Sequence, residues 1–161
     1  MTARTKKDVK PPQTGADEKA TLVGFLDYLR DSIAAKAEGA PEPQVRTAGV
    51  PSGTSVLGLI KHLTCVEGFY FLGEPVKNWA ATMRPGPEET VEDLVAAYRE
   101  TVSRANQVIE SYSDLTLPAP APPGKQPSSM RWLLVHMIEE TGRHAGHADI
   151  LREQIDGATG R

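Results

Sequence analysis

The stretch RWLLVHMIEETGRHAGHADILREQI, residues 131–155, carries a one-sided repeat of apolar and small side chains that decides the fold class. These side chains recur at steps of three and four residues, which places them along one face of an α-helix. The face comprises Leu133, Leu134, Met137, Ile138, Thr141, Ala145, Ala148, Leu151 and Ile155. The stretch therefore predicts a long amphipathic helix whose apolar side packs against other helices.

The 13 prolines divide the rest of the chain. Proline interrupts helix interiors, so groups of prolines mark non-helical segments. Four proline-free stretches remain, near 17–38, 54–72, 90–112 and 129–155, and each has the helical period. We therefore expect an all-α protein, a four-helix bundle with long connecting loops. The connections are roughly 15 residues each, whereas about two to eight is usual in bundles, so a simple up-down-up-down helix order is not assured.

Length and composition bound the organisation and the function class. A chain of 161 residues suits one domain, and we expect a disordered leader at 1–16, the bundle at 17–157 and a tail at 158–161. A formal net charge of -3 disfavours nucleic-acid binding. The single cysteine excludes an intramolecular disulfide and fits the reducing cytoplasm. No apolar run approaches the roughly 20 residues of a membrane span.

All four histidines fall inside the expected helices, His62 in the second and the other three in the fourth. At about 100° of turn per residue, His144 lies about 40° and Glu140 about 80° from the mean apolar direction of the fourth helix. His147 and His136 lie further out, at about 100° and about 120°. His144 and Glu140 are one turn apart, so both could touch one ion together with His62. This geometry predicts a candidate metal site.

Other interpretations of these residues stay open. His62 could be a hydrogen-bonded core histidine, and the pair of Glu140 and His144 could lie at the edge of its helix. A carboxylate that points toward an apolar face is costly unless it is paired or metal-bound. Arg143 or Lys61 could pair with Glu140 instead of a metal. The pattern alone does not choose between these possibilities.

Further side chains near this face have two interpretations each. His147 fits a second-shell hydrogen-bond donor to the site or an edge histidine without a role. Arg131 and Arg143 fit a clamp for an anionic substrate or a solvated helix face. Trp132 and Tyr70 fit the wall of a pocket or ordinary aromatic core packing.

Two segments together resemble the DinB-like metal-binding superfamily: SGTSVLGLIKHLTCVE at 52–67 and RWLLVHMIEETGRHAGHADILR at 131–152. The resemblance extends from about residue 20 to 157. Within the superfamily, the sequence most resembles an actinobacterial branch described as a domain of unknown function. It implies a four-helix bundle with an unusual helix order, often dimeric, that binds a divalent metal. One ligand comes from the second helix and two from the fourth.

The resemblance assigns the metal ligands to His62, Glu140 and His144. Many members have three histidines, and Glu140 stands where the middle one would be. Such a set of two histidines and a glutamate is similar to the mycothiol-dependent maleylpyruvate isomerase branch. Zinc is the metal we expect, with nickel as the alternative, because imidazole and carboxylate suit both.

The function implied by this resemblance is a metal-dependent S-transferase that uses a low-molecular-weight thiol, or a thiol-dependent isomerase. Three protein ligands leave a coordination position open, and a bound cation favours the thiolate form of a thiol. Mycothiol is the expected cosubstrate, an electrophile the second substrate, and a cytoplasmic homodimer the expected form. A non-catalytic metal-binding stress or interaction module is the alternative.

Overall fold

The computed structural model describes residues 8–160 and is all-helical in that range, as the sequence predicts. The expected leader lies partly outside this range, at residues 1–7. Residues 8–16 lie beside the first long helix, where the Tyr28 hydroxyl donates to the Val9 carbonyl oxygen. None of the described helices is long and apolar enough to cross a membrane. The α-helices are α1 (Glu18–Ala37), α2 (Val56–Leu72), α3 (Trp79–Thr82), α4 (Val91–Glu110) and α5 (Met130–Asp156).

Side-chain caps fix where the four long helices begin. In each, an oxygen of the residue before the helix accepts a hydrogen bond from a backbone N–H three residues further on, which satisfies one free donor of the first turn. These caps are Asp17, Ser55, Thr90 and Ser129. Helices α2 and α5 end at Gly73 and Gly157, whose φ angles of 67° and 72° are left-handed and favour glycine. The helix bounds agree with the expected stretches to within two residues.

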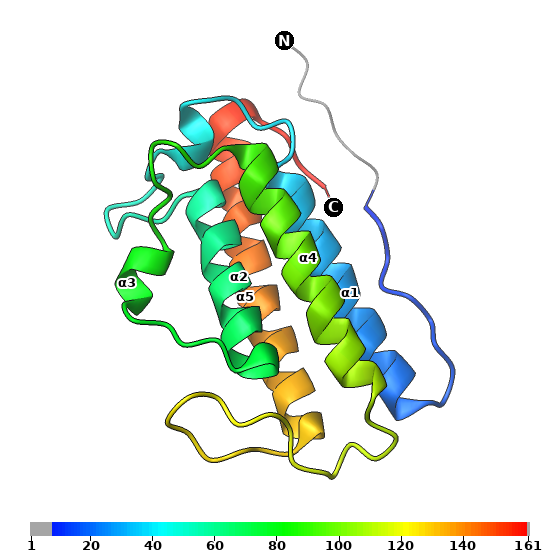
Figure 1. Cartoon of the computed structure of the whole chain (residues 1–161). Helices are drawn as coiled ribbons and strands as arrows, with labels where there is room; N and C mark the ends of the chain where they lie inside the picture. The colour runs from blue at the N-terminus through cyan, green and yellow to red at the C-terminus, as the bar shows by residue number, and fades with distance from the viewer. Residues whose placement is uncertain (1–7, 161) are drawn as a thin grey trace.

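The helices run in the order up, down, down, up (Figure 1). Helix α1 is parallel to its main neighbour α5, and α2 is parallel to its main neighbour α4. Ion pairs mark both alignments: Glu18 binds Arg131 where α1 and α5 begin, and Glu74 binds Arg104 near the ends of α2 and α4. Helices α2 and α5 are antiparallel. Their facing sides hold the candidate metal ligands.

Parallel neighbours require a connection that runs back along the bundle, and residues 73–90 supply it between α2 and α4 (Figure 1). The prolines of this segment predict non-helical structure, but the segment contains the one-turn helix α3. Asn78 caps α3 by accepting a hydrogen bond from the Ala81 N–H. This turn lies beside α2 and brings side chains toward the candidate site.

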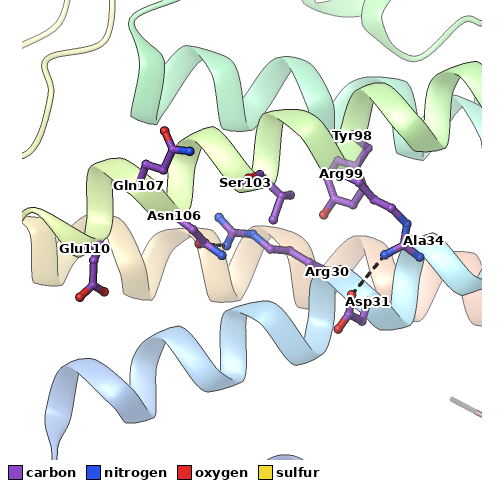
Figure 2. Close-up of a pocket in the computed structure, with 10 residues that line it drawn as sticks. Arg30, Asp31, Ala34, Tyr98, Arg99, Ser103, Asn106, Gln107 and Glu110 are labelled. Carbon is purple, nitrogen blue, oxygen red and sulfur yellow. Dashed lines mark hydrogen bonds and ion pairs between the residues drawn. The ribbon is translucent and has the colours of Figure 1, made fainter.

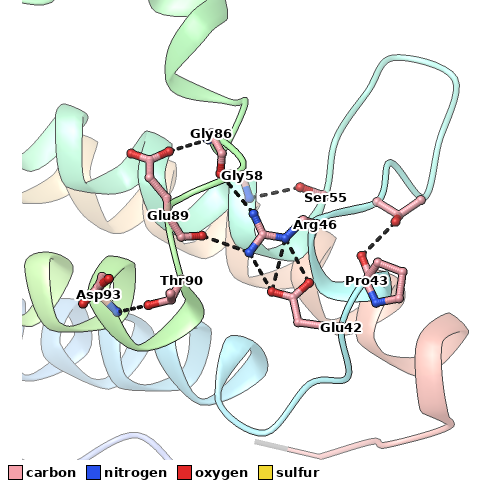
Figure 3. A network of polar contacts seen from close by, with 10 residues as sticks. Glu42, Pro43, Arg46, Ser55, Gly58, Gly86, Glu89, Thr90 and Asp93 are labelled. Atoms are coloured by element: carbon pink, nitrogen blue, oxygen red, sulfur yellow. Dashed lines mark hydrogen bonds and ion pairs between the residues drawn. The ribbon is translucent and has the colours of Figure 1, made fainter.

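Arg46 ties two connections together (Figure 3). It lies in a short 3-10 turn, Gln44–Arg46, and its guanidinium binds the Glu42 carboxylate. The same group donates to the carbonyl oxygens of Gly86 and Glu89 at 3.1 and 2.9 Å. The Glu89 carboxylate in turn accepts from Lys61 on α2. These bonds hold the crossing connection, just before α4 begins, against the preceding connection and α2.

Among the described residues, one ion pair has both of its side chains buried inside the bundle. Arg30 of α1 and Glu67 of α2 are joined by two hydrogen bonds of 2.7 Å, with side-chain exposures of 2% and 0%. Arg30 also donates to Asp27 and to Asn106 of α4. Burial raises the pKa of Glu67 although Arg30 opposes this change. The pair joins α1 to α2 inside the bundle.

Candidate metal centre

The structure brings His62, Glu140 and His144 together between α2 and α5. The Nε2 atoms of His62 and His144 lie 3.4 and 3.1 Å from Oε1 of Glu140. One candidate ligand atom from each residue lies within 4.8 Å of the other two. Their side chains are 14%, 19% and 13% exposed, in the same order. The group is therefore close enough to share one ion and is still reached by solvent.

Thr82 of the α3 turn orients the His62 ring. Its Oγ1 lies 2.7 Å from Nδ1 of His62 and donates to the Trp79 carbonyl oxygen at 2.6 Å. A hydroxyl carries one hydrogen, so Nδ1 of His62 must be the donor to Thr82. A neutral His62 then has no proton on Nε2, and the lone pair of that nitrogen faces Glu140.

This arrangement fits a cation. The Nε2 lone pair of a neutral His62 and the Glu140 carboxylate are both acceptors, and they face each other at 3.4 Å. Two facing acceptors repel each other unless a proton or a metal ion lies between them. Two imidazoles and a carboxylate are also ligand types that zinc accepts. The donor set and the Thr82 contact therefore fit a candidate metal site in which one histidine is oriented.

The protonation states agree with this fit. Burial raises the pKa of Glu140, but the nearby His144 and His62 outweigh this effect, and the pKa lies below its ordinary value. Burial lowers the pKa of His144, although Glu140 opposes the change. Near neutral pH the group therefore contains a carboxylate and an uncharged His144, the forms in which both bind metals.

The remaining histidines and Arg143 lie around this group. His147 is exposed, and its Nδ1 is 3.3 Å from Nδ1 of His144, so its role as a second-shell residue stays a prediction. Arg143 is 62% exposed and pairs with Glu139. His136 is more buried than His147, which reverses the order expected from the helix angles. The reason is that Tyr70 of α2 covers the His136 ring.

Sequence reasoning missed two residues beside the group, Thr82 and Trp79. The Trp79 ring contacts the His62 ring edge-on, with centroids 6.0 Å apart. Both belong to α3, which is too short to show a helical period. The only local sign is Asn78, a residue type that favours helix N-caps. Of the two interpretations of Trp132, core packing is wrong, because this side chain is 53% exposed.

A hollow lies between α1 and α4, and none of the candidate ligands lines it (Figure 2). Its lining includes Arg30, Arg99 and Tyr98, and Arg99 pairs with Asp31 and Glu38. The buried Tyr98 hydroxyl has no hydrogen-bond partner within residues 8–160. Both arginines of the lining already bind carboxylates, so we assign no ligand to this hollow.

The helix order and the group between α2 and α5 place the chain in the DinB-like class of four-helix bundles. A family model described as Mycothiol-S-transferase matches residues 21–157. This match covers most of the chain, which therefore belongs to the mycothiol S-transferase family. Comparison with curated proteins gave no match.

Proposed function

We propose that this protein is a metal-dependent mycothiol S-transferase, or an isomerase that uses the same thiol, with His62, Glu140 and His144 as the metal ligands. The observation that carries the proposal is the convergence of these donor atoms within 4.8 Å in a chain of the mycothiol S-transferase family. Zinc is the expected metal, with nickel as the alternative, since both accept imidazole and carboxylate ligands.

The residues of the site have separate tasks in this proposal. Thr82 accepts the Nδ1 proton of His62 and so keeps the Nε2 lone pair directed at the shared centre. Glu140 supplies one negative charge, and uncharged His144 supplies a second nitrogen ligand. When bound, a divalent metal would add the positive charge that favours the thiolate over the thiol.

The transfer step requires an electrophile and a path for one proton. The thiol proton leaves to solvent or a nearby base as sulfur bonds to the electrophilic carbon. As this bond forms, another bond of that carbon breaks. Its electron pair moves either to a leaving group or, in a conjugated electrophile, to an acceptor atom that takes up a proton. Because the three ligand side chains are partly exposed, both reactants can approach from solvent.

The proposal is tested with untagged protein, since a histidine tag would bind metal itself. Elemental analysis should find about one divalent metal per chain. Thiol consumption with test electrophiles should then be measured with mycothiol, bacillithiol and glutathione, and mycothiol should be the preferred thiol. Glu140→Gln should lower both the metal content and the rate. The neighbouring Glu139→Gln is the matched control, because Glu139 is exposed and pairs with Arg143.

Each outcome distinguishes between the interpretations. Protein without stoichiometric metal, or a rate that Glu140→Gln leaves unchanged, would refute the proposal. Bound metal without thiol transfer would instead support the alternative, a non-catalytic metal-binding stress or interaction module. The cytoplasmic location and the homodimer stay predictions, and sedimentation of the same samples measures the oligomeric state.

A further inference from the structure

His144 contacts His147 through the ring nitrogen that does not face Glu140. The Nδ1 atoms of the two histidines lie 3.3 Å apart, and their ring centroids lie 5.5 Å apart. The other nitrogen of His144, Nε2, lies 3.1 Å from Oε1 of Glu140. Both nitrogens of His144 therefore have a partner among the described residues, one at the candidate metal centre and one outside it.

The contact between the two Nδ1 atoms requires one proton, because two nitrogen lone pairs at this distance repel each other. An uncharged imidazole has a single N–H, and this shared proton can belong to either ring. If it belongs to His147, the proton of His144 is on Nε2 and is donated to Glu140. If it belongs to His144, Nε2 has a free lone pair that faces the ligand group. The tautomer of one ring therefore fixes the tautomer of the other.

Metal binding selects the second arrangement. A histidine binds a metal through a nitrogen without a proton, so Nε2 of His144 releases its proton to solvent when it becomes a ligand. The ring stays uncharged because Nδ1 takes the proton that it shares with His147. His147 then takes up a proton from solvent on its own Nε2, since this side chain is exposed. One proton leaves the pair and one enters it, so the charge of the pair does not change.

His62 is held in a different way and needs no such change. Its Nδ1 donates to Thr82, so its Nε2 has no proton either before or after a metal binds. Thr82 is 6% exposed and acts only as the acceptor of this bond. His147, in contrast, can both donate and accept through Nδ1. This lets His144 pair with Glu140 when no metal is bound and bind a metal through the same nitrogen.

We propose that His147 is a positioning residue for His144, and that the two rings change tautomer together when a metal binds. Without a metal, His147 donates its Nδ1 proton to His144, whose Nε2–H donates to Glu140. With a metal, His144 donates its Nδ1 proton to His147, and the Nε2 lone pair of His144 is directed at the shared centre. The inference rests on the metal ligands of the proposed function. It adds to them a residue that prepares a ligand without binding the metal itself.

The test is NMR of the imidazole nitrogens in isotopically labelled, untagged full-length protein, during titration of the metal-free form with zinc. Protonated, unprotonated and metal-bound ring nitrogens have different chemical shifts, and the sequence has only four histidines to assign. In step with zinc binding, His144 should change from Nε2–H to Nδ1–H, and His147 from Nδ1–H to Nε2–H. His62 should keep its Nδ1 proton throughout, and His136 should not change.

Two variants of His147 test its effect on zinc affinity, measured by competition with a chelator. His147→Ala should weaken zinc binding roughly tenfold, the lower end of the usual effect, because water reaches this exposed position and replaces part of the hydrogen bond. His147→Asn should restore most of the affinity, since its side-chain oxygen is an acceptor close to the position of Nδ1. His136→Ala is the matched control, because His136 lies on the same helix but stacks on Trp132.

Three results would overturn the inference. These are a His147 ring that keeps its tautomer when His144 binds zinc, a metal-bound nitrogen on His147 itself, and a loss of affinity in His147→Ala no larger than in His136→Ala. A His144 ring that binds no zinc would refute both the ligand assignment and this inference. Because no thiol is present, a protein that shows the tautomer change but transfers no sulfur would refute only the proposed transfer. A protein that transfers sulfur while His147 keeps its tautomer would refute only this inference.

Discussion

Replacement of Thr82 by valine tests whether the contact with His62 serves metal binding. Valine has nearly the shape of threonine but cannot accept the Nδ1 proton of His62, whose distance from Oγ1 is 2.7 Å. Thr82 is only 6% exposed, so water cannot readily replace the lost oxygen. The His62 ring is then free to rotate or to take the other tautomer, in which Nε2 carries the proton and cannot bind a metal.

The expected loss of zinc affinity is about 10- to 100-fold, the usual effect of removing such a supporting contact. This range corresponds to about 1.4–2.7 kcal/mol of binding free energy. Competition with a chromophoric zinc chelator measures it on each variant. Thr82→Ser keeps the hydroxyl and should keep most of the affinity.

Thr64→Val is the matched control, because Thr64 lies on α2, two residues from His62, but its hydroxyl donates to the Ile60 carbonyl oxygen of the same helix. Circular dichroism confirms that each variant is folded. Equal zinc affinity in the wild type and in folded Thr82→Val would refute the assignment of His62 as an oriented ligand. Equal losses in Thr82→Val and Thr82→Ser would show that the hydroxyl is not the cause.

Three further results are expected. Zinc at 100 times its Kd should raise the unfolding free energy of the wild type by about 2.7 kcal/mol in urea titrations. Zinc should hardly raise the unfolding free energy of Glu140→Ala. An equal increase in the wild type and in Glu140→Ala would show that the metal binds elsewhere. Glu67→Gln should lower the unfolding free energy by about 3–5 kcal/mol, because it leaves the Arg30 charge buried with a weaker partner; a loss near zero would contradict this account. Gly58→Ala should lower it by about 1–3 kcal/mol, since a Cβ there would clash with the Met83 carbonyl oxygen. Scanning calorimetry measures this change, and an unchanged Tm would contradict the close packing of α2 on the crossing connection.

The helices were predictable because local signals fix them. Proline cannot lie within their interiors, and the capping side chains at Thr90 and Ser129 stand directly before the apolar repeats. The inward position of His144 and Glu140 followed from the same repeat. These features depend on residues a few positions apart, which a single sequence displays directly.

The parts that depend on distant residues were not predictable. The parallel pairing of α2 with α4 follows from the path of the connection 73–90, and its composition shows only that it is not a long helix. The contact of Thr82 with His62 spans 20 residues and has no periodic signal. The exposure of Trp132 likewise depends on which neighbours cover α5, and the period of one helix does not contain that information.

The parallel pairing of the first and last long helices affects how the chain folds during synthesis. Helix α1 packs mainly against α5, and α5 also carries Glu140 and His144. Such contacts between distant segments must wait until both have been made, and they slow folding. While the ribosome is still making α5, the emerging chain has α1 without its main neighbour and His62 without its two partners. Closure of the bundle and assembly of the ligand group therefore depend on the same late event, the emergence of α5 from the ribosome.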